Sequence, residues 1–224
     1  MNAVAPATIP LSPDGRELDH LVPPPGRRYL LGISGAPGAG KSTLAAAVAA
    51  VYDGVVVPLD GFHLADVELE RRGLSDRKGA PETFDADGYA ALLARLRLTP
   101  DHVVMAPAFE RDLEQPLAGA IPVPPEATLV VTEGNYLLLE DGGWPDARTQ
   151  LDAVWHVVTD DELRLRRLVE RHVRFGKTLE QARAWVERVD GANALLVEAA
   201  AHRADVVLDL SAWAPPQTPP ESGP

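Results

Sequence analysis

A glycine-rich segment carries the strongest chemical signal in the chain. It reads Gly35-Ala36-Pro37-Gly38-Ala39-Gly40-Lys41-Ser42-Thr43 and fits the pattern G-x-x-x-x-G-K-[ST] in full. Glycines let backbone N–H groups converge on phosphate oxygens without Cβ atoms in the way, and the positive end of a following helix faces the same anion. Lys41 can then reach the β- and γ-phosphates, and Ser42 can ligate Mg²⁺. The segment predicts a site for ATP or GTP.

Two carboxylates follow predicted strands and could complete that site. Glu133 ends an apolar run, where it could hold the metal or its water shell; an ordinary surface glutamate is the alternative, and beside the glycine-rich segment we favour the metal role. Asp60 follows the run 55–59. Since α/β proteins bind ligands at the carboxyl ends of their strands, Asp60 could accept the proton of an attacking hydroxyl. A turn before Gly61 explains it equally well.

Strands and helices that must position these groups alternate along the chain. Short, mostly apolar runs rich in valine predict strands at 29–34, 54–59, 102–107, 128–132, 153–158 and 204–210. Helical patterns occur at 41–52, 90–98 and 161–174, and a last helix should start at Thr178, whose hydroxyl can form a capping box with Gln181. The alternation predicts an α/β fold with a mainly parallel sheet and helices on both faces.

Both ends of the chain are rich in proline. We expect one domain over residues 28–211, a loose extension at 1–27 and a disordered tail at 212–224, because proline disfavours helices and ladders. The first 25 residues lack a basic leader followed by an apolar segment, so we expect no secretion signal and a cytoplasmic location.

Charge and composition limit the ligands. The 224 residues are 46% hydrophobic and 24% charged, with no apolar run long enough to span a membrane. A net charge of −12 argues against an extended nucleic-acid surface, because such a surface needs clustered Lys and Arg. Basic residues do concentrate at 71–78 and 164–177, which suits a small anionic ligand. Without cysteine, any bound metal should have oxygen ligands.

Five segments together resemble a known superfamily. The segments 35–43, 60–63, 77–85, 133–136 and 164–171 occur in the order seen in the uridine kinases, bacterial type I pantothenate kinases and phosphoribulokinase. The resemblance spans nearly the whole core and is strongest to a branch known as nucleoside/nucleotide kinases or fructose-transport-associated kinases. It implies a three-layer P-loop NTPase fold with a helical lid at about 164–180. It also implies transfer of the γ-phosphate of ATP, with Mg²⁺, to a small-molecule hydroxyl, and a homodimer.

The same resemblance implies catalytic roles for particular residues. Asp60 matches the catalytic base of the superfamily, and Glu133 matches the acid near magnesium. Arg164, Arg167 and Arg171 resemble the lid arginines that close over the phosphates, although a solvated helix face is the alternative. We expect Lys41, Asp60, Arg167 and Arg171 to be catalytic.

Further residues are candidates for binding the acceptor. Asp85 resembles a carboxylate that uridine kinases use on ribose hydroxyls, but it could instead cap a helix. The loop 108–116 could line the acceptor pocket. The full set of acceptor candidates is Asp60, His63, Arg77, Lys78, Phe84, Asp85, Arg111 and Tyr136, with packing, hydrogen-bonding or surface ion-pair roles as alternatives.

The sequence leaves the acceptor open among nucleosides, sugars and pantothenate-like alcohols. Uridine kinases usually have Ser-Phe-Tyr after the base, whereas this chain has Gly61-Phe62-His63. A nucleotide-binding switch is an alternative, although no Asn-Lys-x-Asp guanine-reading segment is present. A nucleoside monophosphate kinase is another, because Arg77, Lys78 and Arg111 could bind an acceptor phosphate.

Overall fold

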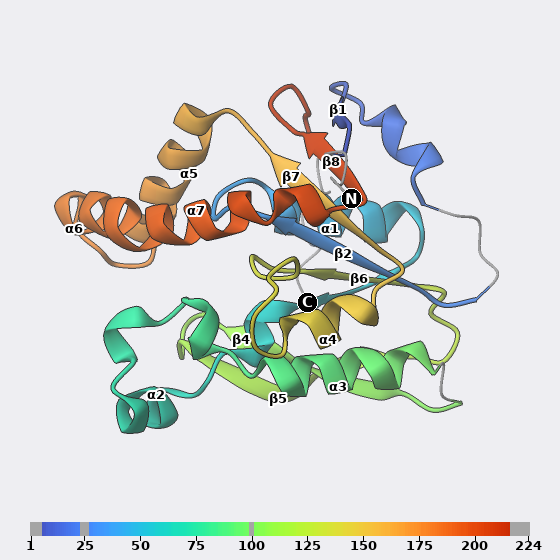
Figure 1. Ribbon diagram of the computed structural model, residues 1–224, viewed down its shortest axis with the longest axis horizontal. Helices are drawn as coiled ribbons and strands as arrows, with labels where there is room; N and C mark the ends of the chain where they lie inside the picture. The colour runs from blue at the N-terminus through green and yellow to red at the C-terminus, as the bar shows by residue number, and fades with distance from the viewer. Residues whose placement is uncertain (1–5, 23–26, 99–100, 216–224) are drawn as a thin grey trace, which may run out of the picture.

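A parallel sheet forms the centre of the protein (Figure 1). The computed structural model describes residues 6–22, 27–98 and 101–215. The main sheet has the strand order β1-β8-β7-β2-β6-β3, and all its neighbouring strands are parallel. Its strands are β1 (Thr8–Pro10), β2 (Tyr29–Gly35), β3 (Val55–Pro58), β6 (Leu129–Glu133), β7 (Ala153–Val158) and β8 (Val206–Asp209).

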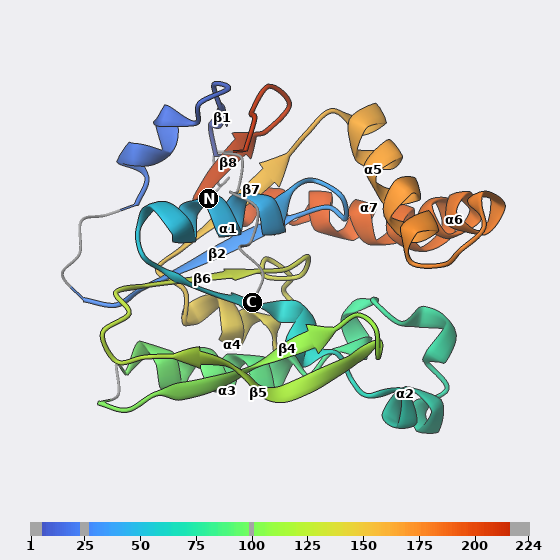
Figure 2. The ribbon, with the colours of Figure 1, turned by 180° about the vertical axis from the view of Figure 1, so that it is seen from behind.

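Helices cover both faces of this sheet. The helix α1 (Lys41–Val51) lies in front of the sheet in Figure 2, whereas α7 (Gly191–Ala199) lies in front in Figure 1. On the α7 side, α3 (Ala86–Arg97) and α4 (Trp144–Thr149) complete the layer. Successive side chains of a strand point to opposite faces, so Leu30 packs in one core and Leu31 in the other. The predicted three-layer α/β fold is confirmed.

One predicted strand belongs to a different sheet. Residues 102–107 were expected among the parallel strands, but β4 (Val104–Glu110) pairs antiparallel with β5 (Gln115–Val123) in a two-stranded sheet. The four residues between β4 and β5 allow a hairpin but are too few for a parallel crossover. Val104 and Val123 are buried in the core with α3, so the hairpin forms the lower wall of the molecule in Figure 1.

The N-terminal segment is part of the fold, contrary to the expectation of a loose extension. β1 pairs with β8 in register from Thr8 to Pro10, and Leu11 is buried in the core on the α1 side. A short 3-10 helix (Arg16–His20) follows. Near the other end, Trp213 is buried in the same core, so the expected tail does not begin at 212; residues 216–224 lie outside the described part of the chain.

The region predicted as a lid is helical. It consists of α5 (Asp161–Arg174), α6 (Leu179–Trp185) and a π-helical turn (Val186–Asp190) that leads into α7. The capping box predicted at Thr178 is present: its hydroxyl accepts from the Gln181 amide N–H, and the Gln181 side chain accepts from the Thr178 N–H. The helix α2 (Asp66–Arg72) lies below this region in Figure 1, and both contribute residues to the lining of one cavity.

Candidate active site

The glycine-rich segment forms a tight loop between β2 and α1. Gly38 and Gly40 have φ angles of 80° and 102°, in the left-handed region that favours glycine. A Cβ atom on Gly38 would lie 2.8 Å from Leu168 Cγ of the lid, so the loop and α5 approach closely because residue 38 has no side chain. Gly40 precedes α1 directly, and the backbone N–H groups at the start of this helix are the anion-binding groups predicted from the sequence.

Lys41 lies folded against this loop. Its Nζ donates to the Gly35 carbonyl at 2.9 Å and to the Ala36 carbonyl at 3.1 Å. The side chain is buried, and this burial lowers the pKa of Lys41, an effect that the neighbouring Glu133 opposes. The ammonium group therefore lies at the phosphate end of the site, as predicted.

A hydroxyl and a carboxylate lie together next to the loop. Ser42 Oγ donates to Glu133 Oε1 at 3.0 Å. Glu133 ends β6 between β2 and β3, paired with Ile33 and Pro58, and burial raises its pKa, as does the nearby Asp60. Hard oxygen ligands of this kind fit Mg²⁺, which usually binds proteins through one or two carboxylates and substrate phosphates. The donor set agrees with the predicted metal ligands.

Asp60 lies at the carboxyl end of β3, in the 3-10 turn Leu59–Phe62. Its Oδ2 is 3.6 Å from Arg111 Nη2 at the tip of the β4–β5 hairpin. Asp60 lines a cavity of about 760 Å³ that it shares with Lys41, Ser42 and Glu133. The predicted base therefore lines the same cavity as the side chains predicted to bind the phosphates and the metal.

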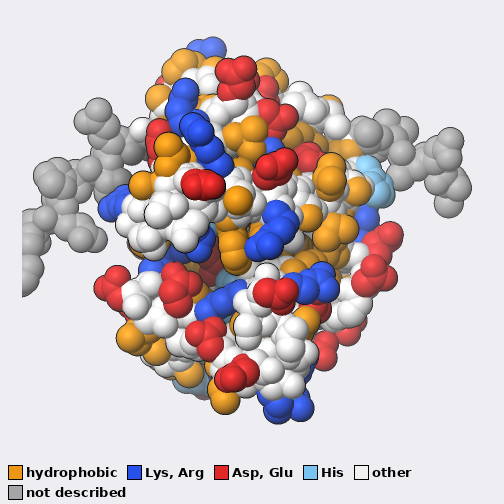
Figure 3. Space-filling model, turned by 90° about the vertical axis from the view of Figure 1, so that its left-hand side faces the viewer, with side chains coloured by type: hydrophobic (Ala, Val, Ile, Leu, Met, Phe, Trp, Pro, Cys, Tyr) orange, Lys and Arg blue, Asp and Glu red, His pale blue; other side chains and the backbone are white. Residues whose placement is uncertain are grey.

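Five acceptor candidates line this cavity: Asp60, His63, Lys78, Phe84 and Arg111. The His63 ring packs against Phe84 with centroids 4.0 Å apart, and its Nδ1 lies 2.8 Å from the Asp60 carbonyl. Burial lowers the pKa of His63, which favours the neutral imidazole. His63 and Phe84 thus form one polar-aromatic wall beside the base. Figure 3 views the molecule from the side of α2 and α6, and side chains of both charge signs are mixed over this face.

Three acceptor candidates do not line this cavity. Asp85 caps α3 by accepting from the Gly88 N–H at 2.9 Å, the alternative role considered from the sequence. Arg77 pairs with Glu82 at 2.6 Å on the surface. Tyr136 is fully buried in the core, where its hydroxyl donates to the Gly79 carbonyl.

Two lid arginines face the nucleotide side of the loop. Arg167 and Arg171 line a cavity of about 280 Å³, together with Leu210, Trp213 and the P-loop residues Gly38, Gly40, Lys41, Ser42 and Thr43. Arg171 also lines the larger cavity, as do Lys41 and Ser42. A phosphate passing from one cavity to the other would therefore meet Lys41 and Arg171.

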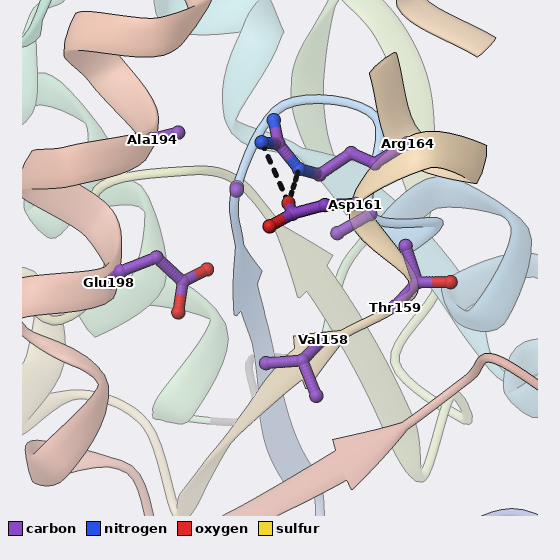
Figure 4. Close-up of a pocket in the computed structure, with 8 residues that line it drawn as sticks. Val158, Thr159, Asp161, Arg164, Ala194 and Glu198 are labelled. Atoms are coloured by element: carbon purple, nitrogen blue, oxygen red, sulfur yellow. Dashed lines mark hydrogen bonds and ion pairs between the residues drawn. The ribbon is translucent and has the colours of Figure 1, made fainter. Parts of the chain in front are cut away.

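Arg164 lies in a different place from the other two lid arginines. It lines a separate cavity of about 240 Å³ between the P-loop, the start of α5 and α7 (Figure 4). Its Nε and Nη2 each lie 3.0 Å from Asp161 Oδ1, and its Nη1 donates to the Pro37 carbonyl at 3.4 Å. Asp161, one helical turn earlier, holds the guanidinium in this cavity, which is separate from the one that Arg167 and Arg171 line. The role that the resemblance implies for Arg164, closing over the phosphates, stays a prediction.

Sequence reasoning missed several residues of the lid wall. His172, Trp185, Asp190 and Asn193 line the same cavity as Asp60. None of these four residues was among the candidate site residues, and Asp190 and Asn193 had no local signal. The π-helical turn before α7, which no pattern predicted, sets where Asp190 and Asn193 lie.

Known proteins resemble this chain over most of its length. A candidate uridine kinase of Schizosaccharomyces pombe is 32% identical over 195 residues, covering 81% of this chain and 83% of that protein. The uncharacterised Escherichia coli protein YggC is 31% identical, covering 84% and 80%. The crystal structure of a candidate fructose transport system kinase from Silicibacter sp. TM1040 has a TM-score of 0.74 at 39% identity, covering 85% and 94%. No family model matches the chain.

The fold and the site define a P-loop kinase that uses ATP to phosphorylate a small molecule. The chain belongs to the P-loop kinase superfamily of the uridine kinases. The resemblance drawn from its motifs is thereby confirmed. Within the described residues, no helix has the length and apolar character needed to cross a membrane.

Proposed function

We propose that this kinase transfers the γ-phosphate of ATP to a hydroxyl of an unphosphorylated small molecule, with Asp60 as the general base. The observation that carries the proposal is the shared cavity, which Asp60, Lys41, Ser42 and Glu133 all line. We also propose that the enzyme acts in the cytoplasm.

Each of these residues has a role in the proposed reaction. Backbone N–H groups of the P-loop and Lys41 bind the phosphates, while Arg167 and Arg171 offset the charge that develops on the transferred group. Ser42 and Glu133 would hold Mg²⁺, which would neutralise part of the charge of the phosphates. Asp60 orients the acceptor hydroxyl and takes its proton. Catalysis would come mainly from positioning and electrostatics.

The charges of the cavity support an acceptor without a phosphate group. Its lining contains six carboxylates but only five Lys or Arg side chains. Lys78 pairs with Asp66 at 2.7 Å, and Arg111 pairs with Asp60, so both are already neutralised. Arg77, the third cation considered for an acceptor phosphate, lies outside the cavity. These pairings disfavour a nucleoside monophosphate kinase.

ADP release tests the proposal. Purified protein with ATP and Mg²⁺ is incubated with a panel of nucleosides, their monophosphates, sugars, sugar acids and pantothenate, and ADP is measured with and without each compound. We expect an unphosphorylated alcohol to accelerate ADP release. Acceleration by a monophosphate alone would contradict the unphosphorylated acceptor, and acceleration by none would favour a nucleotide-binding switch.

A further inference from the structure

The lid carries a buried carboxylate that the proposed reaction does not use. Asp190, at the end of the π-helical turn Val186–Asp190, is only 6% exposed and lines the cavity that contains Asp60. A π-helical turn inserts an extra residue into a helix and often occurs at functional sites. Here it joins α6 to α7 and places the Asp190 carboxylate on the cavity side of the lid.

One imidazole holds this carboxylate. His172 of α5 lies with its Nε2 2.8 Å from Asp190 Oδ2, and both side chains are largely buried. A carboxylate only accepts hydrogen bonds, so Nε2 carries the proton. The pair therefore links α5 to the π-helical turn and fixes the position of the carboxylate.

The carboxylate has unused capacity to accept hydrogen bonds. In the part of the chain that the structure describes, the His172 ring is the hydrogen-bond partner found for it, whereas two carboxylate oxygens offer about four acceptor sites. The second oxygen, Oδ1, is not closed off from the cavity, so a donor in the cavity can reach it. The cavity is where such a donor can come from.

Neighbouring residues indicate the kind of donor. Asn193, on the next turn of the helix, also lines the cavity and donates to the Gly79 carbonyl at 3.3 Å. Trp185 and Phe109 add aromatic surface to the same cavity. Arg171 and Lys177 line it as well, so the lid already supplies cations close to the carboxylate. A hydroxyl meets all of these conditions, because it donates to Asp190 without carrying a charge.

We propose that Asp190, positioned by His172, binds a second, non-reacting hydroxyl of the acceptor, so that the acceptor is a polyhydroxyl compound. This inference rests on the proposed function. Asp60 takes the proton of the reacting hydroxyl, while Asp190 accepts a hydrogen bond from another one. The lid would thus contribute to the choice of acceptor as well as to phosphate binding.

Steady-state kinetics with the accelerating alcohol of the panel test this. We expect Asp190→Asn to raise the KM for the acceptor about tenfold or more, and to leave the KM for ATP within roughly twofold. His172→Gln should raise the acceptor KM by a smaller factor. Glu187→Gln, an exposed acid on the same π-helical turn, is the control and should match the wild type.

A deoxy series separates binding from folding. Analogues of the acceptor that each lack one non-reacting hydroxyl are compared on wild type and Asp190→Asn. The analogue that lacks the hydroxyl bound by Asp190 should lose about tenfold in kcat/KM on the wild type. It should lose little on Asp190→Asn, because in that variant the hydrogen bond to this hydroxyl is already lost. If Asp190→Asn does not fold, the same comparison is made on His172→Gln.

Four outcomes would overturn the inference. They are an unchanged acceptor KM in Asp190→Asn, an equal rise in both KM values, the same deoxy penalties in wild type and variant, and acceptance only of an alcohol with a single hydroxyl. A wild type that no acceptor accelerates would overturn the proposed function and this inference together. Acceleration of the wild type with unchanged variants would overturn the inference alone.

Discussion

Ser42 Oγ donates a hydrogen bond to Glu133 Oε1 at 3.0 Å and so connects the P-loop to the end of β6. Because β6 lies between β2 and β3 in the sheet, this contact places both oxygens between the phosphate loop and Asp60. The position between donor and acceptor groups is the one that a magnesium ion needs to neutralise the transferred phosphate.

Loss of the Glu133 charge should weaken the use of Mg²⁺. We expect Glu133→Gln to need about tenfold more Mg²⁺ for half-maximal acceptor-dependent ADP release, since one of its oxygen ligands loses its charge. Glu126→Gln changes an exposed glutamate in the loop before β6 and serves as the control. A magnesium titration that superimposes on that of the wild type would exclude Glu133 as a metal ligand.

Glu133→Gln should also raise the stability of the protein when no nucleotide is bound. Burial raises the pKa of Glu133 above the ordinary value of 4.5, so the carboxyl ionises more readily in the unfolded chain, and its contribution to stability falls as the pH rises past 4.5. Glutamine does not ionise. We expect Glu133→Gln to raise the Tm by about 2–4 °C at pH 7, which corresponds to ~1 kcal/mol for a chain of this size. The difference should shrink near pH 4; a lower Tm at pH 7 would contradict the assignment.

The lid arginines should differ in their effects. Arg171→Ala should lower kcat by about 10²–10³-fold, because Arg171 lies where the two cavities meet. Arg164→Ala should lower kcat far less, since Asp161 holds Arg164 in the separate cavity of Figure 4. Steady-state kinetics of the two variants decide this, and equal losses would show that Arg164 reaches the phosphates when the lid closes.

Gly38 is required by geometry as well as by backbone conformation. A Cβ atom there meets Leu168 Cγ at 2.8 Å, whereas one on Gly142, with a φ of 60°, meets no atom within 4 Å. We expect Gly142→Ala to cost about 1 kcal/mol of stability through backbone strain alone, with unchanged affinity for ATP. Gly38→Ala should add a loss of ATP affinity of about tenfold or more, measurable by calorimetric titration. Equal ATP affinity in both variants would contradict the account of the loop.

Local patterns predicted the donor half of the site well. The P-loop, the capping box at Thr178 and the strand-end positions of Asp60 and Glu133 all follow from short stretches of sequence. The acceptor half depends on contacts between distant residues. Asp190 faces the cavity because a π-helical turn packs against α5, and its partner His172 lies 18 residues earlier.

Two errors in the predicted fold have similar causes. β1 has three residues and pairs with β8 about two hundred residues later, so nothing near it in the sequence marks it as a strand. The run at 102–107 is valine-rich like the parallel strands, but its short connection to β5 decides its pairing. Asp85 shows a third limit: the same residue type caps helices and binds hydroxyls, and the structure has it as a cap.

The central claim is that Asp60 converts nucleotide binding into phosphate transfer, and one variant tests it directly. Asp60→Asn keeps the shape of the side chain and removes its ability to accept the proton. Binding of ATP by calorimetry and acceptor-dependent ADP release should be measured on the same preparation. The account predicts ATP affinity within roughly threefold of the wild type and turnover reduced by about 10²–10⁴-fold. Turnover near the wild-type rate would contradict it.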